Sequence, residues 1–187
     1  MALAKVLAVE LQKMPNWAKN VLIISGASIL LGLLAHVSIP LPFTPVPITL
    51  QGSVILLMSV LLGPKRAVAT VAAFLAQGAM GFPVFANGAG GLSYFLGSTG
   101  GYLLGYLPAS FVAAYLVERF ETRSIRNALV ALVAGNIVLF ACGAAWLSTF
   151  LGLEKAILLG VVPFLLGDAI KIGLGLKILQ WLGWGKK

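Results

Sequence analysis

Two ionisable residues lie deep within the last long apolar stretch of the chain, whereas Lys177 lies near its end. Asp168 and Lys171 are three positions apart, and in a helix this spacing brings both side chains to one face. A charged side chain at the centre of a membrane helix costs about 2.5–3.5 kcal/mol, so residues of this kind mark a function by default. Two interpretations stay open. The two residues form either an ion pair that holds helices together, or a ligand site that offers an acceptor to N–H donors and a cation to an anion.

Four further residues lie in or beside segments rich in proline and glycine, where they could complete such a site. Gln51 and Asn87 carry amide groups that both donate and accept hydrogen bonds, and Phe85 and Tyr94 offer apolar walls. Helix capping or loop bracing explains either amide alone at least as well. Together with the charged pair, the four residues resemble a ligand pocket that is mostly apolar with a few polar anchors.

The composition requires that most of the chain's surface face lipid. Of the 187 residues, 60% are hydrophobic and 10% are charged, and the mean hydropathy is +1.03. A soluble domain carries about 25% charged residues because its surface faces water. Residues 21–64 and 67–117 contain no Asp, Glu, Lys or Arg, and at about 20 residues per span each stretch has room for two membrane helices. We therefore expect an all-α integral membrane protein.

The apolar runs between helix breakers predict six transmembrane helices in a single membrane domain that takes in residues 1–187. Residues 1–19 are expected to form a short amphipathic segment at the membrane interface. The connections 40–47 and 81–101 are apolar but rich in proline or glycine, so they are expected to be loops. The expected spans are 20–38, 48–63, 67–82, 98–118, 126–150 and 156–182.

Basic residues are concentrated in the segments that this arrangement places on one side of the membrane. With the N-terminus inside, the outer loops contain Lys155 alone, whereas the inner segments contain Lys5, Lys13, Lys19, Lys65, Arg66, Arg119, Arg123, Arg126, Lys186 and Lys187. Cytoplasmic loops of membrane proteins carry the excess of Lys and Arg. Both termini are therefore predicted to be cytoplasmic, in a multi-pass protein of the cell membrane. This placement explains the net charge of +8 without nucleic acid as a partner.

Other motifs narrow the function by their presence or absence. Ser28 and Gly32 form a small-xxx-small pair, which serves close packing either of this chain's own helices or of a partner subunit. His36 stands alone, so the sequence predicts no metal site, and no cofactor is expected. The chain has no G-x-x-x-x-G-K-[ST] loop for ATP and no hydrolytic motif. If it moves a solute uphill, the energy must come from another subunit.

Several motifs, in their order along the chain, resemble those of a known family. They are PVPITLQ at 45–51, LGPKR at 62–66, GFPVFANGAGG at 81–91, GSTGGYLLG at 97–105 and GDAIK at 167–171. From about residue 20 to 182 the chain is similar to the BioY biotin-transport proteins, the substrate-binding S-components of energy-coupling factor transporters. The resemblance implies a six-helix S-component bundle and capture of biotin at the outer face. It also implies two kinds of partner, a transmembrane T-component and a pair of ATP-binding subunits.

Biotin has groups that the candidate residues can recognise. Its urea has two N–H donors and one carbonyl acceptor, which suit Asp168, Asn87 and Gln51. Its carboxylate needs a cation, and Lys171 is the only cation expected to be buried. Tyr94 and Phe85 are expected near the ring or the alkyl chain. Asp168 could instead only orient Lys171.

Three alternatives remain open beside a biotin-binding subunit. The chain could be the S-component for another small carboxylated or amide-bearing vitamin, or a structural subunit that only packs helices. It could also be a membrane enzyme that uses Asp168 and Lys171 as acid and base. The absence of an oriented nucleophile or a metal-ligand set argues against the enzyme. The sequence therefore favours a transporter subunit that binds its ligand without altering it.

Overall fold

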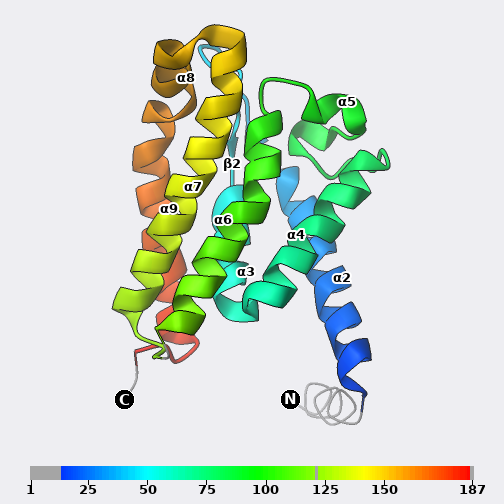
Figure 1. Cartoon of the computed structure of the whole chain (residues 1–187), viewed down its shortest axis with the longest axis vertical. Coiled ribbons are helices and arrows are strands. Elements are labelled where there is room, and N and C mark those ends of the chain that lie inside the picture. The colour runs from blue at the N-terminus through cyan, green and yellow to red at the C-terminus, as the bar shows by residue number, and fades with distance from the viewer. Residues whose placement is uncertain (1–13, 121, 186–187) are drawn as a thin grey trace.

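The computed structural model describes residues 14–120 and 122–185, and its regular structure is almost entirely helical (Figure 1). Residues 1–13 of the predicted amphipathic segment lie outside the described residues. The first described helix, α2 (Asn16–Ala35), starts directly after Pro15, which has an extended backbone. It ends three residues before the predicted limit of the 20–38 span, because the chain then turns into strand β1 (Ser38–Ile39).

Two shorter helices follow and form a hairpin. α3 (Gln51–Leu62) and α4 (Pro64–Ala79) overlap the predicted spans 48–63 and 67–82. They meet at Gly63, whose φ of 76° lies in the region that favours glycine, and a proline begins α4 without loss of a helical hydrogen bond. α4 packs against α2, and both α3 and α4 pack against α6 (Gly100–Arg119), so the hairpin joins the first helix to the rest of the bundle.

The most extensive helix pair is α6 with α7 (Ile125–Leu151). Both helices agree with their predicted spans, 98–118 and 126–150, to within two residues. Glycine makes the close approach possible, because a Cβ atom on Gly101 would overlap the side chain of Trp146. The indole N–H of Trp146 in turn donates to the Gly97 carbonyl (2.9 Å), which fixes the loop that precedes α6.

The last predicted span, 156–182, is two helices rather than one. α8 (Leu153–Gly160) and α9 (Val162–Trp181) are separated at Val161, and Pro163 lies in the first turn of α9. Proline has no N–H to donate and its ring clashes with the preceding turn, so a continuous helix is disfavoured there. The two helices together still form one apolar stretch, Leu153–Trp181, over the predicted span, but the helix is interrupted within it.

The two predicted loops contain short regular elements. β1 pairs antiparallel with β2 (Ile48–Thr49), so the proline-rich loop 40–47 is closed at its base. The segment 81–101 contains η1 (Ala86–Gly88) and the short helix α5 (Leu92–Phe95). Figure 1 shows these elements at the same end of the molecule as α8, and the described N- and C-terminal ends at the other.

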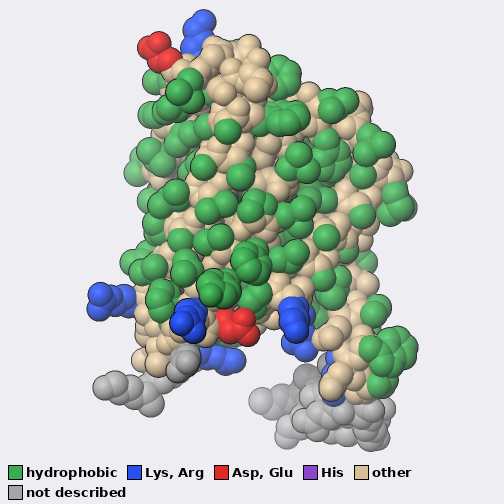
Figure 2. Space-filling view, viewed as in Figure 1, with side chains coloured by type: hydrophobic (Ala, Val, Ile, Leu, Met, Phe, Trp, Pro, Cys, Tyr) green, Lys and Arg blue, Asp and Glu red, His purple; other side chains and the backbone are tan. Residues whose placement is uncertain are grey.

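Four helical stretches in the described residues are long and apolar enough to cross a membrane. They are Asn16–Ala35, Gly100–Arg119, Ile125–Leu151 and Leu153–Trp181, and α3 is a shorter apolar helix. The face in Figure 2 has a broad hydrophobic band, with charged side chains near its two ends. This distribution is that of a mostly helical protein whose sides contact lipid.

The small-residue pair of α2 faces the interior of this chain. Ser28 is fully buried, and its hydroxyl oxygen accepts a hydrogen bond from the side-chain amide of Gln77 on α4 (3.0 Å). A Cβ atom on Gly32 would come within 2.9 Å of the Val84 side chain. Within this chain, Ser28 therefore packs α2 against α4, and Gly32 packs α2 against the segment that follows α4.

Gly101→Ala is expected to lower the free energy of unfolding by about 1–3 kcal/mol, because the added methyl group overlaps Trp146 where α6 meets α7. Gly26→Ala is the matched control, since no heavy atom lies within 4 Å of the position its Cβ would take. Thermal unfolding of the purified protein in detergent compares the two variants. An unchanged unfolding midpoint for Gly101→Ala would contradict the close packing of α6 and α7.

Candidate functional site

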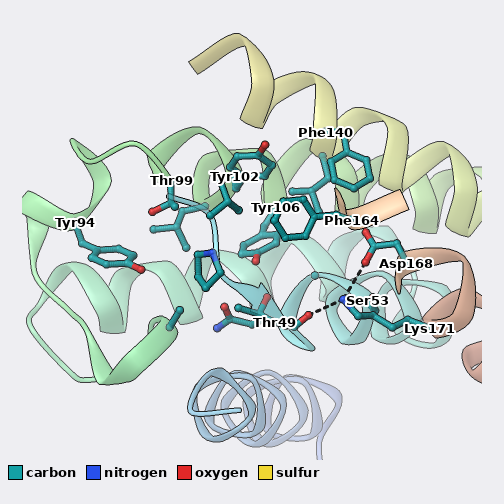
Figure 3. Close-up of a pocket in the computed structure, with 17 residues that line it drawn as sticks. Thr49, Ser53, Tyr94, Thr99, Tyr102, Tyr106, Phe140, Phe164, Asp168 and Lys171 are labelled. Carbon is teal, nitrogen blue, oxygen red and sulfur yellow. Dashed lines mark hydrogen bonds and ion pairs between the residues drawn. The ribbon is translucent and has the colours of Figure 1, made fainter. Parts of the chain in front are cut away.

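The predicted charged pair is formed and is tied to two other parts of the chain. The ammonium nitrogen of Lys171 lies 2.9 Å from Oδ1 of Asp168, and it donates a second hydrogen bond to the carbonyl oxygen of Thr49 on β2 (2.8 Å; Figure 3). The side-chain amide of Asn136 on α7 donates to Oδ2 of Asp168 (3.2 Å). The two charged side chains on α9 are only 16% and 14% exposed. Each charge is therefore removed from most water and compensated by partners within the chain.

The charged pair stands at one end of a cavity of about 80 Å³. In Figure 3, Tyr94 and Thr99 lie at the opposite end, and aromatic rings line the space between. Residues of loop 40–47, β2, α3, η1, α5, α6, α7 and α9 contribute to the lining. The aromatic walls are Tyr102, Tyr106, Phe140 and Phe164. The arrangement is an apolar pocket with its strongest polar groups gathered at one end.

The aromatic wall is held by a hydrogen bond at the junction of α8 and α9. The hydroxyl group of Tyr102 donates to the carbonyl oxygen of Gly160 (2.7 Å), the last residue of α8. Carbonyl groups at a helix end lack hydrogen-bond partners within the helix. The Tyr102 hydroxyl group therefore satisfies a carbonyl that the helix break beside Pro163 leaves without a partner. A Cβ atom on Gly143 would overlap the Tyr102 ring, so α7 leaves the space that the ring fills.

Two of the remaining predicted residues line the cavity. Tyr94 forms part of the wall at the end away from the charged pair. Gln51 also lines it, but it is only 2% exposed, and its amide nitrogen donates to the carbonyl oxygens of Val84 (3.3 Å) and Leu31 (3.5 Å). These bonds brace the start of α3 against α2 and the 81–91 segment, so the bracing role that the sequence left open for Gln51 is present.

Phe85 does not line this cavity and instead supports it from behind. Its ring is fully buried and stacks on Tyr94, with ring centroids 5.3 Å apart and planes inclined by 20°. The edges of Phe74 and Phe95 complete its surroundings, and Gly78 has no side chain because the Phe85 ring occupies that space. Phe85 therefore fixes the position of Tyr94.

Asn87 is not part of the cavity that holds the charged pair. Its backbone has a φ of 60°, and both its backbone N–H and its side-chain oxygen bond to the Ser38 hydroxyl group (3.1 and 2.7 Å). The side chain thus joins η1 to β1 at the end of the molecule that also holds α8. It lines a second cavity instead.

The sequence interpretation missed the partners that position the charged pair. Asn136 is an amide among apolar residues in the middle of the 126–150 span. A polar side chain in such a position is a sequence signal for a functional or structural contact, and it could have identified Asn136. The Thr49 carbonyl gives no signal in the sequence, because any residue has one. Outside residues 1–13, 121 and 186–187, no three His, Cys, Asp or Glu side chains gather as a metal site.

Comparison with known proteins identifies the family. The sequence model of the BioY family matches residues 5–182. The chain belongs to the BioY family. The biotin transporter BioY of Thermotoga maritima is 42% identical over 135 residues, which cover 72% of this chain and 79% of that protein. The biotin transporter BioY of Rhizobium etli is 38% identical over 150 residues, or 75% and 79% of the two chains.

A solved structure has the same fold. The crystal structure of the S-component for biotin from an ECF-type ABC transporter superposes with a TM-score of 0.82 at 31% sequence identity, and covers 90% of this chain and 94% of that one. The family resemblance predicted from the motifs is confirmed. These relatives are transporter proteins and not enzymes, so the interpretation of Asp168 and Lys171 as an acid and a base in a membrane enzyme has no support.

The Asp168–Lys171 pair is expected to stabilise the bundle only as a pair. Asp168→Asn leaves the ammonium group without its counter-ion and is expected to cost about 2–3 kcal/mol, less than a fully buried pair because some water reaches it. Lys171→Met should lower the free energy of unfolding by a similar amount, and the double variant should lower it by less than the sum of the two single losses. Thermal unfolding of the wild type, the two single variants and the double variant measures this coupling. Lys177→Met, on the exposed side of α9, is the control. Strictly additive losses would contradict the pairing.

Proposed function

We propose that this chain is the biotin-binding S-component of an energy-coupling factor transporter. The observation that carries the proposal is the Asp168–Lys171 pair at one end of an otherwise apolar pocket, in a BioY-family chain with the S-component fold. The apolar walls suit the fused rings and alkyl chain of biotin, and the charged pair suits its urea. The relatives named as biotin transporters support this choice over another vitamin.

The contacts of the pair favour one orientation of the ligand. Of the three N–H groups of Lys171, two donate to Asp168 and Thr49, so the third can donate to the urea carbonyl. Each carboxylate oxygen of Asp168 accepts one bond within the chain and has a further lone pair for a urea N–H. A ligand carboxylate would instead bring a second anion to a cation that Asp168 already neutralises. We therefore place the urea at the charged pair and the carboxylate at the Tyr94 end. This orientation differs from the role in carboxylate binding that was predicted for Lys171.

In the membrane, the chain is proposed to form six spans with both termini in the cytoplasm. The four long helical stretches are joined by the α3–α4 hairpin, which supplies two shorter spans. Loops 40–47 and 81–101 then face the outside, together with α8. This orientation places the pocket where it can receive biotin from outside the cell membrane.

Transport requires energy that this chain has no motif to supply. We propose that a T-component and two ATP-binding subunits provide it, as the description of the solved relative as part of an ECF-type ABC transporter suggests. Co-purification of those subunits with a tagged version of this chain tests the partnership.

Lys171→Ala is expected to weaken biotin binding at least about a hundredfold, because the urea carbonyl loses a charged donor in a site shielded from water. Lys177→Ala is the matched control on the same helix, and its side chain is exposed. A thermal-shift titration measures both, since biotin at a hundred times its Kd should stabilise the folded chain by about 2.7 kcal/mol. Unchanged affinity in Lys171→Ala would exclude the assignment, and displacement of labelled biotin by other vitamins would favour a different ligand.

The orientation predicts which introduced cysteines a membrane-impermeant reagent reaches in intact cells. With the native Cys142 replaced by alanine, Lys155→Cys should be labelled by an impermeant maleimide, whereas Lys65→Cys should be labelled only after lysis. Both positions are exposed, so access depends on the side of the membrane and not on burial. The reverse pattern would invert the topology.

A further inference from the structure

A second cavity lies beyond the end of the pocket that is farthest from the charged pair. Its volume is about 380 Å³, and it lies between the proline-rich loop 40–47 and the segment 93–99. It shares Pro47, Tyr94 and Thr99 with the inner cavity, so these three residues lie where the two spaces meet. A ligand that enters the inner cavity from the outer loops passes them.

Side chains within the chain hold this outer cavity at two of its borders. The Ser38–Asn87 hydrogen bonds join β1 to η1, and the hydroxyl group of Thr44 donates to the Leu159 carbonyl oxygen on α8 (2.7 Å). The first tether fixes the base of loop 40–47, and the second fixes its middle. The roof of the cavity therefore has a position that the chain itself determines.

The residues that line the outer cavity carry no formal charge in the part of the chain that the structure describes. Its polar groups are neutral hydroxyl and amide groups, such as those of Thr44, Asn87 and Ser93. A ligand carboxylate in this space therefore forms no ion pair with the lining residues. A ligand with a neutral amide in place of the carboxylate loses no ion pair. The strong electrostatic selection for an anion that a buried lysine would impose is missing here.

The inner cavity alone is small for a ligand, and the outer cavity offers further room beside it. Pockets for small molecules have volumes of about 300–1,000 Å³, and the inner cavity, at about 80 Å³, is well below that range. The outer cavity is several times larger than the inner one. A ligand whose urea binds the charged pair thus has its alkyl chain and carboxyl end directed toward the larger, neutral space.

We propose that the outer cavity accommodates biotin conjugated through its carboxyl group, so that the chain binds biotin amides as well as free biotin. The inference rests on the proposed function, in which the urea lies at the Asp168–Lys171 pair. The inference extends the ligand class from free biotin to its amides. The chain selects the urea and ring of the ligand and tolerates a neutral extension at the other end.

The test compares biotin with N-propyl biotinamide and with an N-methylated biotin, using calorimetric titration of the purified full chain in detergent. The propyl amide should bind with a Kd within about tenfold of that of biotin, a difference of about 1.4 kcal/mol or less. The N-methyl analogue blocks a urea donor and crowds the charged pair, so it should lose more than about a hundredfold. A loss of more than tenfold for the amide, while biotin still binds, overturns the inference and leaves the proposed function standing. If none of the three ligands binds, the proposed function itself fails.

A pair of tryptophan variants checks where the extension lies. Ser93→Trp narrows the outer cavity without altering the inner one, so it should weaken the amide at least about tenfold more than it weakens biotin. Leu92→Trp is the matched control, since Leu92 is 70% exposed and lines neither cavity. Equal effects of Ser93→Trp on both ligands would contradict placement of the extension in the outer cavity.

Discussion

The arrangement of the site depends on the cost of keeping an ammonium group and a carboxylate inside an apolar bundle. Neither charge has more than limited contact with water, so each must find its partners within the chain. Those partners come from three directions: the two charges share α9, Asn136 comes from α7, and the Thr49 carbonyl comes from β2. A single polar cluster thereby fixes the position of α9 relative to a neighbouring helix and to the base of loop 40–47.

That loop is held at the edge of the bundle by hydrogen bonds that also satisfy backbone groups of the elements around it. Irregular backbone at membrane depth is tolerated where protein covers it or water reaches it. β1 and β2 pair with each other, Thr44 bonds to α8, and Gln51 donates to carbonyl groups on α2 and the 81–91 segment. The same contacts that satisfy the backbone also position the walls of the pocket.

Much of this could be predicted from sequence because it depends on local patterns. Hydropathy and helix breakers located most helices, and the i, i+3 spacing correctly paired Asp168 with Lys171. The contacts of Asn87 and Phe85 could not be predicted, because each depends on a residue distant in sequence or on an aromatic cluster that forms only in the fold. Pro163 is visible in the sequence as a helix breaker. The partner of the carbonyl group at the end of α8, the hydroxyl group of Tyr102, could not be predicted because Tyr102 is distant in sequence.

The residues predicted as ligand contacts that instead brace the loops still bear on affinity. A ligand that must order a flexible loop loses part of its binding energy to that ordering, at about 0.5–1.5 kcal/mol for each side chain immobilised. Here Gln51 and Asn87 make their hydrogen bonds to other parts of the chain, and Phe85 holds Tyr94 by stacking. Loop 40–47 also has several prolines, whose restricted backbones have less freedom to lose. The bracing contacts therefore favour binding even where the same side chain also lines a cavity, because they hold the pocket walls in place before a ligand arrives.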